Sequence, residues 1–138
     1  MPKMFMWIIL LLPCVCAAAT NVAPAQKDEA FSRFYADFQN AVKTEDKEKM
    51  ASLTDFERFT WEGNDSFRQI KTKEVFLKNY DKMFSSTIKN MIETAKPLKI
   101  DDNSYFINWH TKDLEYSLHF NRKGDCGFRF EGLAVGPY

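Results

Sequence analysis

The strongest constraint on the fold is a long stretch of alternating apolar and polar residues from Leu98 to Phe130. Alternation is typical of β-strands with one buried face, because successive side chains point to opposite sides of a strand. Residues 102–103 (DN), 112–113 (KD) and 122–124 (RKG) interrupt the pattern with residue types that favour turns. The stretch therefore predicts four antiparallel strands joined in order, as a meander.

The turn lengths predict which residues face one another. Two-residue turns at 102–103 and 112–113 and a three-residue loop at 122–124 would all place the same apolar residues on one face. The predicted pairs are Leu98–Ile107, Ile100–Tyr105, Tyr105–Phe120, Ile107–Leu118, Trp109–Tyr116, Phe120–Cys126, Leu118–Phe128 and Tyr116–Phe130. A slip of one residue would turn these side chains to the other face, so burial specifies the register.

Both histidines of the chain fall on the opposite, polar face. His110 would pair with Glu115, and His119 would pair with Phe106, four residues along the strand from His110. Four residues span about 13 Å at 3.3 Å per residue. Zinc lies only about 2.0 to 2.1 Å from its nitrogen ligands, so the two histidines cannot share one metal ion.

One polar cluster remains in the predicted register, formed by His110, Glu115 and Glu131. Two carboxylates beside an imidazole could shift the pKa of a group that acts as an acid or a base, or they could hold a weakly bound metal. The alternative is a solvated sheet face or part of a dimer surface, which is the more common arrangement. Glu115 directly opposite Glu131 is repulsive, which favours either a protonated His110 between them or a different turn geometry.

Helical periodicity precedes the strands. From Asp28 to Val42 apolar residues recur every three or four positions, which predicts an amphipathic helix with one buried stripe. Thr44 or Asp46 can cap a second, short helix that ends near Leu53.

Helical spacing returns at residues 76–84 and 88–92, and residues 85–87 can end the first of these helices and cap the second. Pro97 closes this region. Residues 56–70 break the helical pattern, and a turn at 63–65 predicts two short extended pieces there.

The N-terminus has the layout of a secretory signal peptide, with a basic residue, an apolar block at 4–15 and small residues up to Ala19. The block is shorter than the roughly 20 residues of a membrane helix. We expect cleavage of residues 1–19, a flexible leader at 20–27 and a single domain at 28–138. The protein would be secreted to the periplasm; a lipoprotein fits less well, because Cys14 and Cys16 match a lipid-attachment pattern poorly.

Cysteine and charge add two further expectations. After cleavage only Cys126 would remain, and it could not form an internal disulfide. The chain has 19 basic and 19 acidic residues in alternation, without the basic stripe of a nucleic-acid binder. We find no nucleotide, cofactor or metal motif, so no cofactor is predicted. The 13 phenylalanines predict a thick core or a cavity.

The element order resembles the nuclear transport factor 2-like superfamily over about residues 28–135. The resemblance rests on the helical segments FSRFYADFQNAV, DKEKMASL and EVFLKNYDKMF, followed by the meander. Ala41-Val42 before Asp46-Lys47 is similar to small secreted bacterial members. The resemblance implies an α+β fold, in which N-terminal helices pack on a curved antiparallel sheet to form a cone with an interior pocket. Enzymes of the superfamily (ketosteroid isomerase, scytalone dehydratase and limonene epoxide hydrolase) place aspartate, histidine or tyrosine in that pocket. Other members are carriers, dimerisation modules or toxin-immunity proteins.

On the implied fold the apolar face of the meander would line the pocket. The candidate ligand-binding residues are Tyr105, Trp109, Tyr116, Phe128 and Phe130; the two tyrosines are also compatible with core positions. No histidine or carboxylate of the meander points inward, and a lone Cys126 thiol is typically inert. No catalytic residue is therefore assigned.

These observations favour a secreted, non-catalytic binding module for a small apolar ligand or a protein partner, one case being an immunity protein for an envelope toxin. A homodimer through the sheet is compatible with this function. The alternative is a small isomerase or hydratase, which needs a carboxylate in the pocket. Asp37, Asp55, Glu57 or Asp81 could supply it if the helices are rotated differently.

Overall fold

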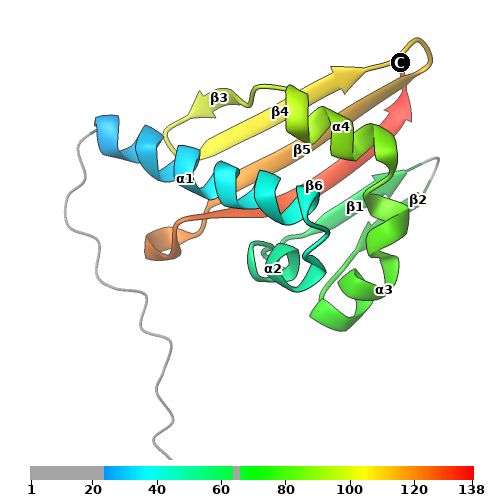
Figure 1. Cartoon of the computed structure of the whole chain (residues 1–138), viewed down its shortest axis with the longest axis horizontal. Coiled ribbons are helices and arrows are strands. Elements are labelled where there is room, and N and C mark those ends of the chain that lie inside the picture. The colour runs from blue at the N-terminus through cyan, green and yellow to red at the C-terminus, as the bar shows by residue number, and fades with distance from the viewer. Residues whose placement is uncertain (1–23, 64–65) are drawn as a thin grey trace, which may run out of the picture.

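The computed structural model describes residues 24–63 and 66–138, with side chains from residue 29 onward. Helices cover one face of a six-stranded sheet (Figure 1). The elements are α1 (Pro24–Lys43), α2 (Lys47–Ser52), β1 (Thr60–Gly63), β2 (Ser66–Gln69), α3 (Lys73–Met83), α4 (Ser86–Thr94), β3 (Leu98–Asp101), β4 (Ser104–His110), β5 (Leu114–Arg122), a 3-10 turn (Gly124–Cys126) and β6 (Phe128–Pro137). The predicted α+β class is confirmed.

Helix α1 buries the predicted stripe, which includes Phe31, Phe34 and Phe38. It starts earlier than predicted, at Pro24. At its C-terminus the main-chain N–H of Asp46 donates to Ala41 O (2.9 Å). Glu45 adopts a left-handed φ of 54° there, a position that usually holds glycine. The chain therefore turns sharply enough for Asp46 to cap the next helix.

The short helices begin at side-chain caps. Asp46 accepts from the Lys49 N–H at α2, Thr72 from Val75 at α3, and Ser85 from Ile88 at α4. Two of these caps, Asp46 and Ser85, were among the predicted alternatives. Each cap satisfies a main-chain donor that has no partner inside the helix.

The sheet has the strand order β2-β1-β6-β5-β4-β3. The meander β3–β6 is antiparallel, as predicted, and β1 and β2 form the two expected extended pieces. Strand β1 then joins β6 in parallel, with Thr60 opposite Gly132, so the sheet is mixed. The apolar pattern alone gave no partner for β1.

The predicted β3–β4 register is wrong. Leu98 pairs with Phe106 and Lys99 with Tyr105, and the irregularity between Lys99 and Asp101 leaves Ile100 without a partner on β4. A bulge adds one residue on one strand and thereby changes which face later residues occupy. Leu98 and Ile100, expected in the core, are 55% and 59% exposed.

The β4–β5 register is confirmed at every predicted pair, including Tyr105–Phe120 and Trp109–Tyr116. The β5–β6 register is wrong, because the turn runs through the 3-10 segment and is longer than three residues. Phe120 pairs with Phe130, and a second bulge then places His119 opposite Gly132. Cys126 lies in the turn rather than in a strand.

Aromatic rings fill the space between helices and sheet. Phe130 lies 5.1 Å from Phe38, 5.0 Å from Phe59 and 5.7 Å from Phe120, measured between ring centroids. Each large buried ring removes on the order of 150 to 250 Å² from water. The predicted thick aromatic core is therefore present.

Some sequence predictions fall on residues outside the described ranges. The signal peptide 1–19, the first part of the leader and most of the turn at 63–65 lie there. The expectation that Cys126 is left as a lone thiol depends on cleavage of residues 1–19, which lie outside the described residues. No helix within 24–63 or 66–138 is long and apolar enough to cross a membrane.

Candidate functional site

The face of the sheet opposite the helices carries both histidines, as predicted. His110 pairs with Glu115, and His119 pairs with Phe106. His110 is exposed and stacks on Tyr138, with 4.7 Å between ring centroids. We call this surface the outer face of the sheet.

The predicted cluster of His110, Glu115 and Glu131 is not formed. Glu115 pairs with Gly136, while Glu131 is the extra residue of the bulge beside His119. The turn is longer than the three residues assumed, so Glu131 moves along the sheet away from Glu115. Within the described part of the chain, no group of three or more His, Cys, Asp or Glu side chains could hold a metal ion.

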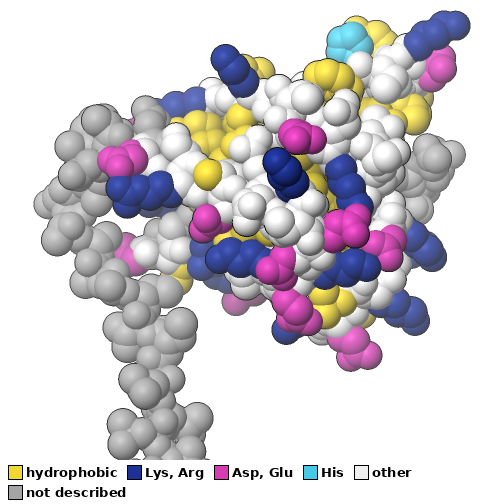
Figure 2. Space-filling model, in the orientation of Figure 1, with side chains coloured by type: hydrophobic (Ala, Val, Ile, Leu, Met, Phe, Trp, Pro, Cys, Tyr) yellow, Lys and Arg dark blue, Asp and Glu magenta, His cyan; other side chains and the backbone are white. Residues whose placement is uncertain are grey.

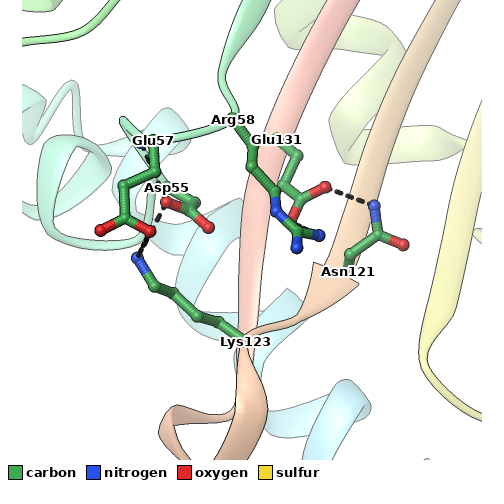
Figure 3. A network of polar contacts seen from close by, with 6 residues as sticks. All are labelled: Asp55, Glu57, Arg58, Asn121, Lys123 and Glu131. Atoms are coloured by element: carbon green, nitrogen blue, oxygen red, sulfur yellow. Dashed lines mark hydrogen bonds and ion pairs between the residues drawn. The ribbon is translucent and has the colours of Figure 1, made fainter.

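A polar network joins the turn before β6 to the loop after α2 (Figure 3). The Lys123 Nζ donates to Asp55 Oδ1 at 3.0 Å and lies 3.2 Å from Glu57 Oε2. The Asp55 side chain is only 2% exposed, whereas that of Glu57 is 79% exposed. Hydrogen bonds to Asp55 and then to Glu57 raise the pKa of the Lys123 amine. This pair anchors the turn.

The second half of the network centres on Glu131. Its Oε2 accepts from Asn121 Nδ2 at 2.5 Å, and its Oε1 lies 3.7 Å from Arg58 Nη1. The side chain of Glu131 is 10% exposed, and its Oε1 has no hydrogen-bond partner among the residues that the structure describes. A carboxylate so well covered and only partly bonded is unusual.

His119 lies between this network and the rest of β5. Its Nε2 is 3.3 Å from the Ser117 hydroxyl. Partial burial lowers the pKa of His119, against a smaller raising effect from the Glu131 charge. The imidazole is therefore mainly neutral near pH 7.

A separate groove of about 410 Å³ runs between α1 and strands β3–β4. It is lined by Phe31, Ser32, Tyr35, Ala36, Gln39, Pro97, Lys99 and Tyr105. Tyr35 OH and Gln39 Nε2 both donate to Ile92 O, at 2.8 and 2.9 Å. Burial raises the pKa of Tyr35, so the phenol stays protonated. The walls are thus held in place and mostly apolar.

Only one of the predicted pocket residues lines this groove, namely Tyr105. Phe128 and Phe130 are buried among other rings, Tyr116 is buried, and Trp109 packs against the core from a partly buried position. Contact of these four residues with a ligand stays a prediction.

The four carboxylates considered for an enzyme differ in environment. Asp37 is exposed, and the side chains of Asp81 and Glu57 are 78% and 79% exposed. Asp55 is buried but accepts hydrogen bonds from Lys123 and from the Glu57 N–H. On the helix side of the molecule, basic and acidic side chains are mixed, without a basic stripe (Figure 2).

Two solved structures share this arrangement of helices and sheet. A nuclear transport factor 2-like superfamily protein from Salmonella enterica serovar Typhimurium matches with a TM-score of 0.51 and 8% identity, over 83% of this chain and 93% of its own. A candidate ketosteroid isomerase from Shewanella frigidimarina matches with a TM-score of 0.50 and 8% identity, over 80% of this chain and 97% of its own. The chain has the nuclear transport factor 2-like fold. No protein-family model matches the sequence, and no curated protein matches it significantly.

Within this nuclear transport factor 2-like fold, sequence reasoning missed the contacts of Glu131 and Asp55. Glu131 was assigned to the wrong rung, because the turn before β6 is longer than assumed and the bulge beside His119 leaves no local pattern. Gly127, with its left-handed φ of 77°, was the available signal for a longer turn. Asp55 follows a helix and accepts from the N–H of Glu57, two residues on, as aspartates in turns commonly do.

Proposed function

We propose that the protein is an exported binding module that takes up a small apolar ligand in the groove between α1 and β3–β4. The observation that carries this proposal is the groove itself, whose walls are formed mainly by Phe31, Tyr35, Ala36, Pro97 and Tyr105. Apolar concave surfaces with a few polar groups are the usual form of small-molecule sites.

The polar groups at the groove suggest the shape of the ligand. Phe31 and Tyr105 stack face to face with 3.6 Å between centroids, so their contact fixes α1 against β4 beside the groove. Ser32 and Gln39 add polar atoms, and Lys99 adds a positive charge that is shared with Asp102. An apolar body with one polar or anionic end fits these walls best.

The few buried polar side chains in the interior favour a binding role over catalysis. Among the described residues, the buried polar side chains are Thr54 and Asp55. Asp55 is held by Lys123, which leaves it poorly suited to take a proton from a substrate. The isomerase or hydratase alternative requires a carboxylate whose pKa is raised by burial beside an open pocket.

A large side chain introduced at the rim of the groove tests this proposal. Ala36 is exposed and lines the groove, so Ala36→Trp should block it without disturbing the core. Asp37→Trp, on the same helix but outside the groove lining, is the matched control. Binding of a fluorescent fatty-acid analogue should weaken at least tenfold in Ala36→Trp only. Equal binding by both variants and the parent chain would refute the groove as the site.

A protein partner is the second candidate, because Leu98 and Ile100 expose apolar side chains on β3. Among the described strands, β3 is at the edge of the sheet and pairs with β4 alone, and an open edge can accept another strand. Ile100→Lys should then abolish capture of a stoichiometric partner from envelope extract, while Val75→Lys, at an exposed site on α3, should not. Unchanged capture by Ile100→Lys would remove this candidate.

A separate experiment tests export, by measuring the mass of the chain recovered from the cell. The chain expressed with its natural N-terminus in a bacterium should be recovered from the periplasm without residues 1–19. An intact chain in the cytoplasm would contradict export but leave the groove proposal untouched.

A further inference from the structure

The outer face of the sheet carries a second hollow, a trough of about 440 Å³ above β6. Its floor contains the small residues Ala134 and Gly136, and Pro137 closes one end. Glu115 and Ser117 of β5 form one wall, and Glu62 and Phe67 of β1 and β2 form the other. Because Phe67 is 66% exposed, this wall presents an apolar surface to whatever enters.

Ser117 places a hydroxyl in this trough beside a base. Ser117 and His119 are two residues apart on β5 and therefore point to the same face. The Ser117 Oγ lies 3.3 Å from His119 Nε2, and Ser117 lines the trough. A nucleophile and a base within hydrogen-bond reach form the minimal unit of covalent catalysis, with somewhat long distances expected before substrate binds.

The carboxylate of Glu131 also acts on the imidazole, because its charge raises the pKa of His119 against a larger lowering by partial burial. Glu131 occupies the bulge next to Gly132, which is the partner of His119. Asn121 holds Glu131 Oε2, while Oε1 is buried and lacks a hydrogen bond. Of the charged groups nearby, Arg58 faces Glu131 rather than the trough wall. The negative charge can therefore stabilise His119 once it is protonated.

We propose that Ser117 and His119 form a nucleophile–base pair that hydrolyses a small carboxylic ester bound in the trough, with Glu131 as a positioning residue. In the first step Ser117 Oγ bonds to the carbonyl carbon and its proton passes to His119 Nε2. The ester C–O bond breaks, and the leaving alcohol takes that proton. Water then attacks the acyl-Ser117, gives a proton to His119, and releases the acid as Ser117 is restored.

The trough also indicates which esters fit. Phe67 and the small floor favour a flat apolar group, while the carboxylates of Glu62 and Glu115 disfavour an anionic ester. Asn108 pairs with Ser117 and donates from Nδ2 to Glu115 Oε1 at 2.9 Å. An amide NH₂ has two donors, and we assign the second N–H of Asn108 to the developing oxyanion. This site is on the opposite face from the apolar groove and does not depend on the proposed binding function.

A fluorophosphonate probe tests the pair directly, since its phosphorus is attacked by the serine oxygen and fluoride leaves. Incubation of the whole chain should give one adduct, mapped to Ser117 by peptide mass. Ser117→Ala should remove it. His119→Gln should slow labelling about 100-fold or more, and Glu131→Gln should lower the maximal labelling rate while the half-saturating probe concentration stays unchanged.

Matched controls separate chemistry from folding. His110→Gln changes the other histidine of the same face, and Ser104→Ala changes a serine of β4 that does not line the trough; both should label like the parent chain. Hydrolysis of 4-nitrophenyl acetate should fall in the same variants, and the anionic 4-nitrophenyl hydrogen succinate should be a poorer substrate. An adduct at any other residue, equal labelling of His119→Gln, or no adduct between pH 7 and 9 would overturn the proposal.

Discussion

Successive residues of β5 lie in two different environments. Leu118 and Phe120 point into the ring-lined core and are fully buried, whereas Ser117 and His119 point to the outer face and are covered by no helix. The inner face is stabilised by non-directional burial of apolar area. The outer face depends on directional contacts, such as that between Ser117 and His119. The difference suggests that inner residues set stability and outer residues are free to serve binding or chemistry.

The largest expected effect is on the inner face. Phe130→Ala should lower the free energy of unfolding by about 3 to 5 kcal/mol, because it removes a fully buried ring and leaves a cavity. Phe67→Ala, at an exposed position of the outer face, should change it by less than about 0.5 kcal/mol. Urea denaturation of both variants measures the contrast. Comparable losses would mean that the outer face also carries packing energy.

An intermediate effect is expected where the polar network meets the core. Asp55→Ala should cost about 1 to 3 kcal/mol, because the Lys123 amine and the Glu57 N–H lose their acceptor. Glu57→Ala touches the same lysine from an exposed position and should cost less than about 0.5 kcal/mol. Thermal unfolding at low and high salt distinguishes them. Equal melting temperatures for the two variants would show that burial of Asp55 contributes nothing.

Two buried tyrosines allow a comparison within the core between a hydroxyl with a hydrogen bond and a hydroxyl without one. Tyr35→Phe should cost about 1 kcal/mol, because its hydroxyl donates to Ile92 O. Tyr80→Phe should be neutral or stabilising by up to about 1 kcal/mol, because the buried Tyr80 hydroxyl has no hydrogen-bond partner within 24–63 and 66–138. Chemical denaturation at pH 7 measures both changes. A clear loss in Tyr80→Phe would reveal a partner for that hydroxyl.

The raised pKa of Tyr80 predicts that the stability of the folded chain falls at alkaline pH. Burial raises its pKa to about 12 from 10.0 in the unfolded chain. The folded state therefore holds the Tyr80 proton to a higher pH than the unfolded state does. The contribution of Tyr80 to the free energy of unfolding is full below pH 10 and is lost as the pH rises to about 12. The fall in stability over that range should be smaller in Tyr80→Phe than in the parent chain. An identical pH profile would contradict the raised pKa.

The smallest effect is expected from His119. Its pKa is lowered by partial burial, so the unfolded chain binds a proton more readily than the folded chain. Stability is therefore greatest above the unfolded pKa of about 6.5 and falls as the pH drops below it. His119→Gln should reduce this acid dependence more than His110→Gln does. Melting temperatures between pH 5 and 8 provide the measurement.

The sequence predicted much of the fold from local pattern. The stripe of α1 and the strands of the meander depend on the spacing of neighbouring residues, and both were found. The β4–β5 register was predicted because a two-residue turn at 112–113 leaves one pairing that buries Ile107 and Leu118. The β5–β6 turn contains a 3-10 segment and Gly127; the glycine permits a longer turn, but the local sequence does not fix the number of residues in it.

The candidate sites were less predictable than the elements. Leu98 and Ile100 were expected inside and are exposed, because one bulge in β3 changes the parity. The groove brings α1 against β3–β4, across more than sixty residues of sequence between Phe31 and Pro97. The apolar face predicted Tyr105 as a pocket residue, but it could not show which of the other four aromatic residues would be covered by rings from the helices.

The sequence by itself determined which side chains share a face wherever a helix or strand is regular, because that depends only on periods of 3.6 and 2 residues; the bulges at Ile100 and Glu131 break the period. Tertiary structure decided which strand lies beside which, notably β1 beside β6 and Glu131 beside His119. Those pairings depend on loop lengths, bulges and the shape of the buried core. These features bring together residues that are far apart in the chain, so a local sequence pattern cannot predict them.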